Sequence, residues 1–473
     1  MRLSDNAKKC RFHAPMNSGR RPLALALLTV LSTSAAQAAS LDVTAAYKMK
    51  AASYSNLHYN TADKNSHSFI TNDARLGIAV RRIPLETRGG EETTMDLGIV
   101  LRAIGVSGST NSIASPFSRV ASYYPNADLT PFIENAYLKV HKLWGKPWEA
   151  TFGRQSYRLG GGLLLDDDGA GLTGVSARGE LPWWNMKLEG FVFNDRNPLN
   201  VSGPNSLDLA GLSLDLPGEG VWQLNQLIER DRANQVVYGC TYTGNPEANG
   251  CRVSKAFRSF TGLRYQISYG PMVFDGEAAL QRGYATPTGL LPAPNHITYN
   301  GNAQVVRMKW KQSLFRTGEG VARMSVARGS GDDPGTRTTD EAFFPSRGHR
   351  HNGLERVGFG ELFAATAYDA FGGNYSTTTN SGLRKGASGL VVVGAGYTPP
   401  AYKSLTLDID FFLYQAERVS AGSSTLGTEW DLRVRYPIRD QLNIAASMAY
   451  FRAGQFTDPG RSVARKYSFE VSG

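Results

Sequence analysis

Apolar and polar residues alternate along this chain with a period of two, in recurring runs of roughly ten residues. In the run TEWDLRVRY, which begins at Thr428, Trp, Leu, Val and Tyr take one face, and Glu, Asp and two Arg take the other. The run VVRMKWK, which begins at Val305, has the same pattern. Helical periodicity is nearly absent, and after residue 38 no segment reaches the roughly 18 consecutive apolar residues of a membrane-spanning helix. The pattern therefore predicts an all-β chain whose strands have one apolar and one polar face.

The connections between these runs decide which all-β architecture the chain adopts. About 18 strands are expected, beginning near residues 41, 65, 93, 132, 148, 172, 184, 207, 220, 255, 271, 297, 320, 389, 405, 427, 442 and 464. Every second connection is a tight turn, such as GKP, LPWW or PIRD, whereas the others are long, at residues 109–131, 160–171, 196–206, 233–254, 285–296, 329–388, 421–427 and 454–463. A soluble β-sandwich would show the same alternation, but it has no reason to sort its loops by length to opposite ends. Sorted loops and an even strand number are typical of a transmembrane antiparallel β-barrel with short periplasmic turns and long extracellular loops, because strands in lipid must close into a ring without edges. We therefore expect the chain in the outer membrane of a bacterial cell, surrounded by its lipid.

The first 38 residues have the features of a separate export signal. Arg20 and Arg21 precede the apolar run PLALALLTVLSTSAA, which leads into the small-residue motif Ala36-Gln37-Ala38. A basic region, a short apolar core and such a motif are typical of a secretory signal peptide. The sequence thus divides into a signal peptide over 1–38 and an outer-membrane barrel over 39–473, whose longest extracellular loop spans about 329–388. Because residues 1–38 carry six Lys or Arg and one Asp, the formal net charge falls from +10 to +5 after cleavage, which gives no argument for a nucleic-acid partner.

Two cysteines remain after cleavage, Cys240 and Cys251, on either side of a loop rich in Gly, Thr and Asn. In an exported chain this spacing favours a disulfide over a metal site, since two further ligands are lacking nearby. The sequence shows no catalytic constellation: it has no Gly-x-Ser-x-Gly elbow, and His349 and His351 lie among arginines in RGHRHNG. We expect no enzyme activity, no cofactor and no metal. A barrel enzyme or an adhesin that uses the long loops is the less favoured class.

If the apolar face meets lipid, the polar face lines the lumen, and a ring of about 18 strands leaves room for an aqueous channel. Basic residues outnumber acidic ones among those expected to point inward. The basic set is Arg75, Arg81, Arg102, Lys139, Arg178, Lys187, Arg258, Arg264, Arg307, Lys309, Lys311, Arg323, Arg433 and Arg435, and the acidic set is Asp73, Asp96, Glu180, Glu189, Asp408, Asp410, Glu429 and Asp431. Rings of Arg and Lys favour anions, and guanidinium groups bind carboxylates through two parallel hydrogen bonds. Arg178, Arg264, Arg307 and Lys309 are therefore candidate substrate-binding residues. The alternative is a general pore in which these charges pair with one another.

The stretch LGGGLLLDDDGAG, which begins at Leu159, contains three adjacent carboxylates, Asp166, Asp167 and Asp168. Paired catalytic carboxylates need a fixed separation and tuned pKa values, and adjacent residues on a glycine-rich loop offer neither. We expect this loop, on the long-loop side of the barrel, to turn at the mouth or to fold inward. There the aspartates would face the arginine lining as a gate or constriction, or would form a solvated loop tip.

Three stretches resemble the alginate export porins of the outer membrane. They are the segment from Ile133 to Glu180, which contains Gly153-Arg154-Gln155, the motif ARGSGDD that opens the longest loop, and LGTEWDLRVRYPIRDQLNIAASMAYFRAG. The resemblance implies a monomeric barrel of about 18 strands that passes an anionic polysaccharide, such as a polyuronate, through an arginine-lined constriction with export partners in the periplasm. It assigns that lining to Arg154, Arg433 and Arg435. The triple Gly and triple Asp depart from the family pattern, so a general pore or a porin for small organic anions is the alternative.

Overall fold

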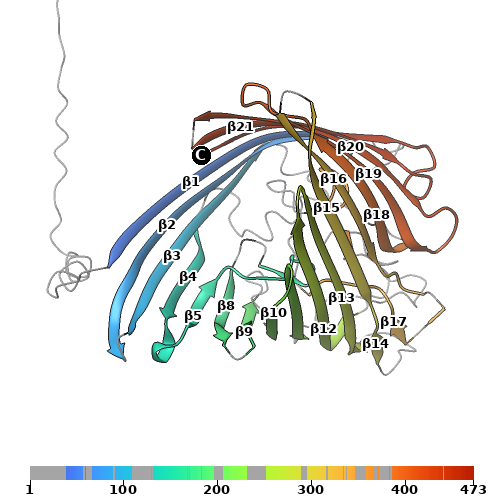
Figure 1. The fold of residues 1–473 in the computed structure, drawn as a ribbon. Coiled ribbons are helices and arrows are strands. Elements are labelled where there is room, and N and C mark those ends of the chain that lie inside the picture. The colour runs from blue at the N-terminus through green and yellow to red at the C-terminus, as the bar shows by residue number, and fades with distance from the viewer. Residues whose placement is uncertain are drawn as a thin grey trace, which may run out of the picture.

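Long strands tilt across one closed β-sheet, drawn as a ribbon in Figure 1. The computed structural model describes residues 39–56, 59, 66–88, 91–108, 129, 131–167, 169, 171–182, 184–196, 206–231, 252–288, 296–315, 318–333, 335–336, 338–346, 358–365, 370–371, 383, 386–439 and 441–473. The predicted signal peptide and the cysteines of the predicted disulfide, Cys240 and Cys251, lie outside these residues. In the described ranges, no helix is long and apolar enough to cross a membrane.

Within the described residues, 18 long antiparallel strands form the ring. They are β1 (Ser40–Ser55), β2 (Ser66–Arg88), β3 (Glu91–Gly108), β4 (Phe132–His141), β5 (Trp148–Gln155), β8 (Leu172–Leu181), β9 (Met186–Arg196), β10 (Ser206–Leu216), β11 (Val221–Asp231), β12 (Arg252–Tyr269), β13 (Met272–Thr288), β15 (Asn302–Phe315), β16 (Gly318–Gly329), β18 (Ala387–Thr398), β19 (Thr406–Val419), β20 (Thr425–Arg439), β21 (Leu442–Ala453) and β22 (Val463–Ser472). Four short strands, β6 (Arg158–Leu159), β7 (Leu165–Asp166), β14 (Ile297–Tyr299) and β17 (Thr339–Asp340), and the 3-10 turn η1 (Leu143–Gly145) lie in the connections.

Pairing of the last strand with the first closes the ring. Strand β1 pairs with β22 from Lys48↔Ser472 to Ser55↔Arg465, and every other long strand pairs with its neighbours in the sequence. The predicted all-β barrel is therefore confirmed, and each expected strand is present. The largest difference in a strand start is near residue 297, where the short strand β14 precedes β15.

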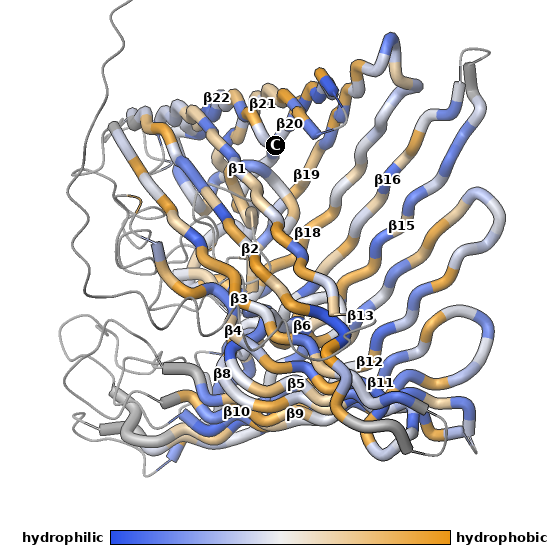
Figure 2. Tube along the Cα trace, turned by 90° about the vertical axis from the view of Figure 1, so that its left-hand side faces the viewer, coloured by the Kyte–Doolittle hydropathy of each residue, from blue (hydrophilic) through white to orange (hydrophobic). Residues whose placement is uncertain are grey.

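Side chains alternate between the lumen and the outer face, as the sequence pattern predicts. Figure 2 shows the matching alternation of hydropathy along β2, β15 and β16. On β20, Trp430 and Leu432 are exposed on the outer face, whereas Glu429 and Asp431, which alternate with them, are buried inside the ring. Exposed apolar side chains on the outside and polar ones on the inside are what a strand needs when lipid surrounds the barrel.

The short connections lie at one end of the barrel, together with both ends of the described chain. The backbone N–H of Tyr47 donates to the carbonyl of Gly473 (2.7 Å), and the Gly473 N–H donates back to Tyr47 (2.9 Å). Trp144 and Trp184, in the turns after β4 and β8, are exposed there. Short turns and interfacial aromatic residues identify this end as the periplasmic one.

Parts of two long connections run back into the ring. The β6–β7 hairpin and pieces of the 329–388 connection supply many of the buried apolar side chains, namely Leu163, Leu164, Leu165, Phe343, Phe344, Phe359, Leu362, Phe363, Phe371 and Leu383. Phe343 packs against Phe260 of β12, and Phe363 packs against Phe451 of β21. An apolar core therefore lies between the barrel wall and these segments. The longest connection, expected as an extracellular loop, has described parts inside the barrel.

Candidate constriction inside the barrel

The GGGLLL stretch forms a hairpin inside the barrel. Strands β6 and β7 pair through Arg158↔Asp166 and Leu159↔Leu165. Gly160 lies in the turn with φ of 62°, in the left-handed region that glycine adopts at least cost. The three leucines that follow the glycines are at most 3% exposed. The triple leucine is therefore the apolar surface that holds the hairpin inside the barrel.

Hydrogen bonds fix the hairpin turn to β12 and β13. The Gly161 N–H donates to Oε2 of Glu277 (3.1 Å), and Arg264 donates to the Gly160 carbonyl (3.3 Å). Arg264 also donates to both carboxylate oxygens of Asp275, at 2.9 and 3.2 Å. The arginine thus links the wall to the hairpin, and its charge is already matched by a carboxylate.

The first two aspartates of the DDD run lie inside the barrel and are buried. Asp166 accepts a hydrogen bond from Nε of Arg158 (2.7 Å), and the Nη2 atom of the same ion pair lies 2.6 Å from the carboxylate. The Asp167 N–H donates to the Tyr157 carbonyl (3.1 Å), and its carboxylate accepts from the Gly169 N–H (3.3 Å). Asp166 and Asp167 therefore do not lie at a solvated loop tip. Asp168 lies outside the described residues, and the gating role of the three aspartates stays a prediction.

The segment 341–346 is held against β11, β12 and β13. Arg258 and Glu229 form a buried ion pair with two hydrogen bonds of 2.7 and 2.9 Å. Arg258 also donates to the Phe344 carbonyl (3.0 Å), and the Phe344 N–H donates to the side-chain oxygen of Gln281 (2.9 Å). One arginine therefore connects the barrel wall to the backbone of this segment.

Replacing Arg258 by Gln should loosen the segment 341–346. The change leaves Glu229 as an unpaired buried charge, a situation that costs about 3–5 kcal/mol, and it weakens the bond to Phe344. We expect faster amide hydrogen exchange over 341–346 in the reconstituted barrel, measured by mass spectrometry. Arg282→Gln, which changes an exposed arginine of β13, is the control. Unchanged exchange in Arg258→Gln would show that this contact does not hold the segment.

The segment 358–365 is held against β19, β20 and β22. On β20, Glu429 accepts hydrogen bonds from the N–H groups of Leu362 (2.7 Å) and Phe363 (2.9 Å). On β22, Lys466 donates to the carboxylate of Glu361 (2.5 Å) and to its carbonyl (3.2 Å). All three charged groups are buried. We call Glu361, Glu429 and Lys466 the latch.

A small cavity lies where the hairpin, the second inward segment and the wall of β13 and β15 meet. Its lining consists of Arg158, Gly161, Gly162, Leu163, Asp166, Glu277, Val305, Arg307, Phe359 and Phe371. Two guanidinium groups and two carboxylates thus face a space with phenylalanine and leucine walls. Arg158 is paired with Asp166, but Arg307 has no salt bridge with any residue that the structure describes. Arg307 is therefore the cation of the cavity that a carboxylate solute could engage.

Most candidate lumen residues lie on the inner face but in ion pairs. The pairs are Arg178–Asp215 (3.8 Å), Arg264–Asp275 (2.9 Å), Arg433–Glu470 (3.8 Å) and Arg435–Asp408 (2.7 Å). Lys309, two residues beyond Arg307 on β15, is exposed in the lumen and, like Arg307, has no salt bridge with a described residue. Four of the candidate lining residues thus form ion pairs, whereas Arg307 and Lys309 on β15 form none with a described residue.

The assignment of Arg154 to the lumen lining is wrong. Arg154 lies in register with Thr173 of β8, and Phe152, two residues earlier, is exposed on the outer face. The guanidinium donates to the Thr173 hydroxyl (3.4 Å). Gln155 takes the inward position, where it is buried and accepts a hydrogen bond from Ser176 (2.8 Å). Because strand side chains alternate, a shift of one residue in the GRQ motif moves the arginine to the other face.

Sequence reasoning missed Lys466, Glu361 and the phenylalanines of the cavity. For Glu361 and Phe359 the signal that could have found them is apolar composition inside a long connection, in the stretch GFGELFAA, whereas Lys466 on β22 has no such signal. Apolar residues in a connection expected to face water indicate burial elsewhere. Among the side chains that the structure describes, no group of three or more could hold a metal ion.

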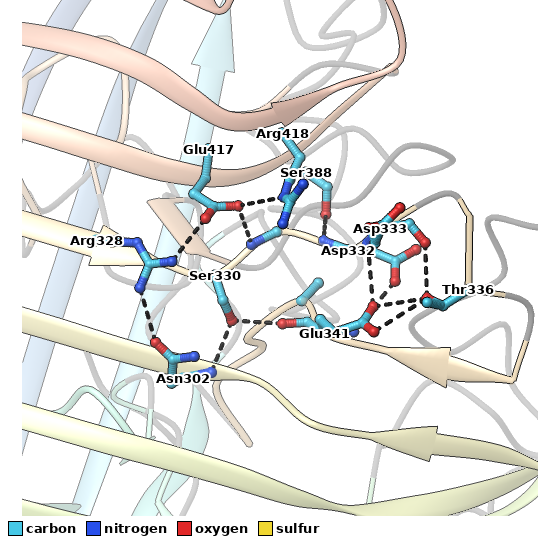
Figure 3. Close-up of polar contacts among 12 residues, drawn as sticks. Asn302, Arg328, Ser330, Asp332, Asp333, Thr336, Glu341, Ser388, Glu417 and Arg418 are labelled. Atoms are coloured by element: carbon cyan, nitrogen blue, oxygen red, sulfur yellow. Dashed lines mark hydrogen bonds and ion pairs between the residues drawn. The ribbon is translucent and has the colours of Figure 1, made fainter.

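A hydrogen-bond network fixes the point where the longest connection leaves β16 (Figure 3). Glu417 of β19 accepts hydrogen bonds from Arg328 (2.8 Å) and from the Gly331 N–H (3.0 Å). Asp333 accepts from the Gly335 N–H (2.9 Å), which forms a local turn. The chain is therefore anchored at the end of β16 before it turns inward.

Asp340, on the short strand β17, gives this connection a pH-dependent contact. Its carboxylate accepts a hydrogen bond from the Ala342 N–H (2.9 Å), and burial raises the pKa of Asp340 to about 7. In an unfolded chain the pKa of Asp is about 3.9. The folded segment therefore holds the proton more tightly, so its stability is greatest below about pH 4 and falls as the pH rises towards about 7.

We expect amide protection factors over 339–343 to be lower at pH 8 than at pH 5, after correction for intrinsic exchange. Asp340→Asn keeps an acceptor oxygen and cannot ionise, so it should remove most of this difference. Asp333→Asn, a change at a half-buried carboxylate of the same connection, should leave it unchanged. Equal protection at both pH values in the unmodified chain would contradict the assignment to Asp340.

Comparisons with known proteins support this architecture. No protein family model matches the sequence, and no curated protein sequence matches it. Solved structures from Pseudomonas aeruginosa match over 91% of this chain: OccK2 (OpdF) in complex with glucuronate (TM-score 0.52, 12% identity, 97% of that chain), OccK11 (OpdR) (0.50, 13%, 95%) and the outer membrane protein opdK (0.50, 12%, 98%). At this identity the likeness concerns the fold alone.

The closed ring, the apolar outer face, the short turns at one end and the inward segments together define the architecture. Since lipid leaves no partner for an open sheet edge, such a ring is a membrane-spanning structure. The chain has the fold of an 18-stranded porin of the bacterial outer membrane.

Proposed function

We propose that the chain is a passive channel that lets small carboxylate-bearing organic anions cross the outer membrane. The observation that carries the proposal is Arg307, which has no salt bridge with a described residue and lines, together with Phe359 and Phe371, a cavity of about 20 Å³ that an entering solute would have to widen. A guanidinium binds a carboxylate through two parallel charge-assisted hydrogen bonds. The phenylalanines offer apolar surface to the rest of the solute.

The inward segments favour a small solute over a polymer. The hairpin is bonded to β12 and β13, and the segment 358–365 is bonded to β20 and β22, so the chain crosses the lumen between separate parts of the wall. A polymer would have to displace these contacts. OccK2, which shares the fold, has been solved in complex with glucuronate, and this supports the same class of solute.

Export of a polyuronate is the second candidate. The sequence resemblance and the inward position of Arg433 and Arg435 favour it. It would require the hairpin and the segment 358–365 to leave the lumen during passage. In either case Asp166 would serve as the counter-charge of Arg158, which an incoming carboxylate would compete for.

Planar-bilayer recordings test the proposal. Under a KCl gradient the reversal potential should indicate anion selectivity, and glucuronate on one side should reduce the chloride current by binding at Arg307. Cation selectivity, or a current unaffected by glucuronate, would overturn the proposal. Block by polyuronate oligomers followed by their appearance on the other side would favour the second candidate.

A further inference from the structure

The outer face carries a groove where the last strand of the ring meets the first strands. The groove has a volume of about 600 Å³ and is lined by Ala51, Ala52, Ser53, Ser68, Phe69, Ile70, Ser107, Tyr467, Ser468 and Phe469. Small residues of β1, β2 and β3 form its floor. Tyr467 and Phe469 of β22 are exposed beside it and form one wall.

The surface of the groove is suited to hydrocarbon. Ser53 lies opposite Tyr467, and Ala51 lies opposite Phe469, so the small side chains lie directly beside the aromatic wall. The Ser68 hydroxyl donates to the Ser53 hydroxyl (2.9 Å), so one polar hydrogen at the groove is satisfied within the protein. The outer face of a transmembrane barrel contacts lipid. An acyl chain can therefore lie in this groove, closer to the barrel axis than the lipid chains that surround it.

Two arginines lie at the extracellular end of this groove. Arg465 is opposite Ser55 on β1 and opposite Tyr450 on β21, and Arg452 is opposite Val463. Arg452 and Arg465 are therefore diagonal neighbours on the outer face. Both are exposed, and neither has a salt bridge with a residue in the described ranges. The Arg465 guanidinium lies 6.0 Å from the ring centre of Tyr450.

The height of these arginines corresponds to lipid headgroups. Tyr450 and Tyr467 come next along the two strands toward the periplasm, and aromatic residues mark the membrane interface in barrels. Two uncompensated cations just beyond that level face the headgroups of the outer leaflet. A basic cluster at this level attracts anionic headgroups.

We propose that this face binds one phosphorylated lipid of the outer leaflet, with its phosphate on Arg452 and Arg465 and one acyl chain in the groove. Charge complementarity selects this occupant over a second copy of the chain. In a twofold dimer across this face, four arginines with no acid partner of their own would be brought together. This binding site is independent of the solute that passes through the lumen.

Native mass spectrometry of the detergent-solubilised full barrel tests the site. The probes are lipid A, which carries phosphates, and the same lipid after enzymatic removal of its phosphates. We expect one lipid A to stay bound. The Arg452→Gln/Arg465→Gln variant should bind lipid A at least about tenfold more weakly than the unmodified chain does, because hydrogen bonds to charged groups are lost. For the same reason the unmodified chain should bind the dephosphorylated lipid at least about tenfold more weakly than lipid A.

Two further variants make the result specific. Ser53→Phe fills the groove, keeps both arginines and should also weaken retention of lipid A. Lys403→Gln/Arg439→Gln removes two exposed charges at the periplasmic end and should leave retention unchanged. The proposal is overturned by equal binding of the two lipids, by equal binding to the Arg452/Arg465 variant, or by a protein dimer that Ser53→Phe dissociates.

Discussion

Removing the latch should raise the single-channel conductance several-fold. The double variant Glu429→Ala/Lys466→Met removes the acceptor of two N–H groups in the segment 358–365 and the partner of Glu361. These groups are buried, and breaking a buried ion pair costs about 3–5 kcal/mol. Such a loss shifts the local opening equilibrium by roughly a hundredfold or more. The segment would then leave the wall of β20 and β22 for much of the time and widen the pathway.

The matched control is Glu180→Gln/Lys187→Met, which also removes one acid and one base. That pair is solvent-exposed, with side chains 56% and 51% exposed and 3.7 Å between the charged atoms. An exposed pair contributes little to stability, so the conductance of the control should stay near that of the unmodified chain. If the latch variant also keeps the original conductance, the segment 358–365 does not limit the pathway.

Neutralising Arg307 should lower glucuronate uptake about tenfold, because a charge-assisted hydrogen bond is worth about 1.5–3 kcal/mol. The measurement is the rate of glucuronate entry into liposomes that contain Arg307→Gln. Uptake of neutral sugars should change little, since the substitution hardly alters the width of the cavity. Arg307→Lys keeps the charge without the two-pronged geometry and should restore uptake in part.

Arg178→Gln is the matched control for Arg307→Gln. It removes the same charge from the inner wall of β8, outside the lining of the cavity. There the Arg178 guanidinium lies 3.8 Å from the Asp215 carboxylate. A small effect of Arg178→Gln beside a large effect of Arg307→Gln would locate selectivity at the cavity. Equal effects would instead indicate that the general charge of the lumen determines uptake.

The strands could be predicted from the sequence because their signal is local. In β20, neighbouring residues already show which side chains face lipid and which face the lumen, and the sequence PIRD marks where the strand ends. Arg154 is assigned to the lining by the family resemblance and not by this local pattern, which places it on the same face as Phe152. A strand assignment that is right in its bounds still places a side chain on the wrong face when the register shifts by one residue.

The constriction could not be predicted because its contacts join distant parts of the chain. Lys466 and Glu361 are separated by 105 positions, and Glu277 and Gly161 are separated by 116. No local pattern specifies such pairs. Ion pairs between strands depend likewise on register. The sequence could supply a list of inward charges but could not show that Arg435 forms a salt bridge with Asp408 while Arg307 has none with a described residue.

The most direct measurement compares glucuronate with glucuronamide, its neutral relative of nearly the same size, entering liposomes that contain the unmodified barrel. A pathway that selects carboxylates at Arg307 predicts faster entry of glucuronate, and loss of that preference in Arg307→Gln. Equal entry of the two solutes, or faster entry of the amide, would contradict a carboxylate-selective channel.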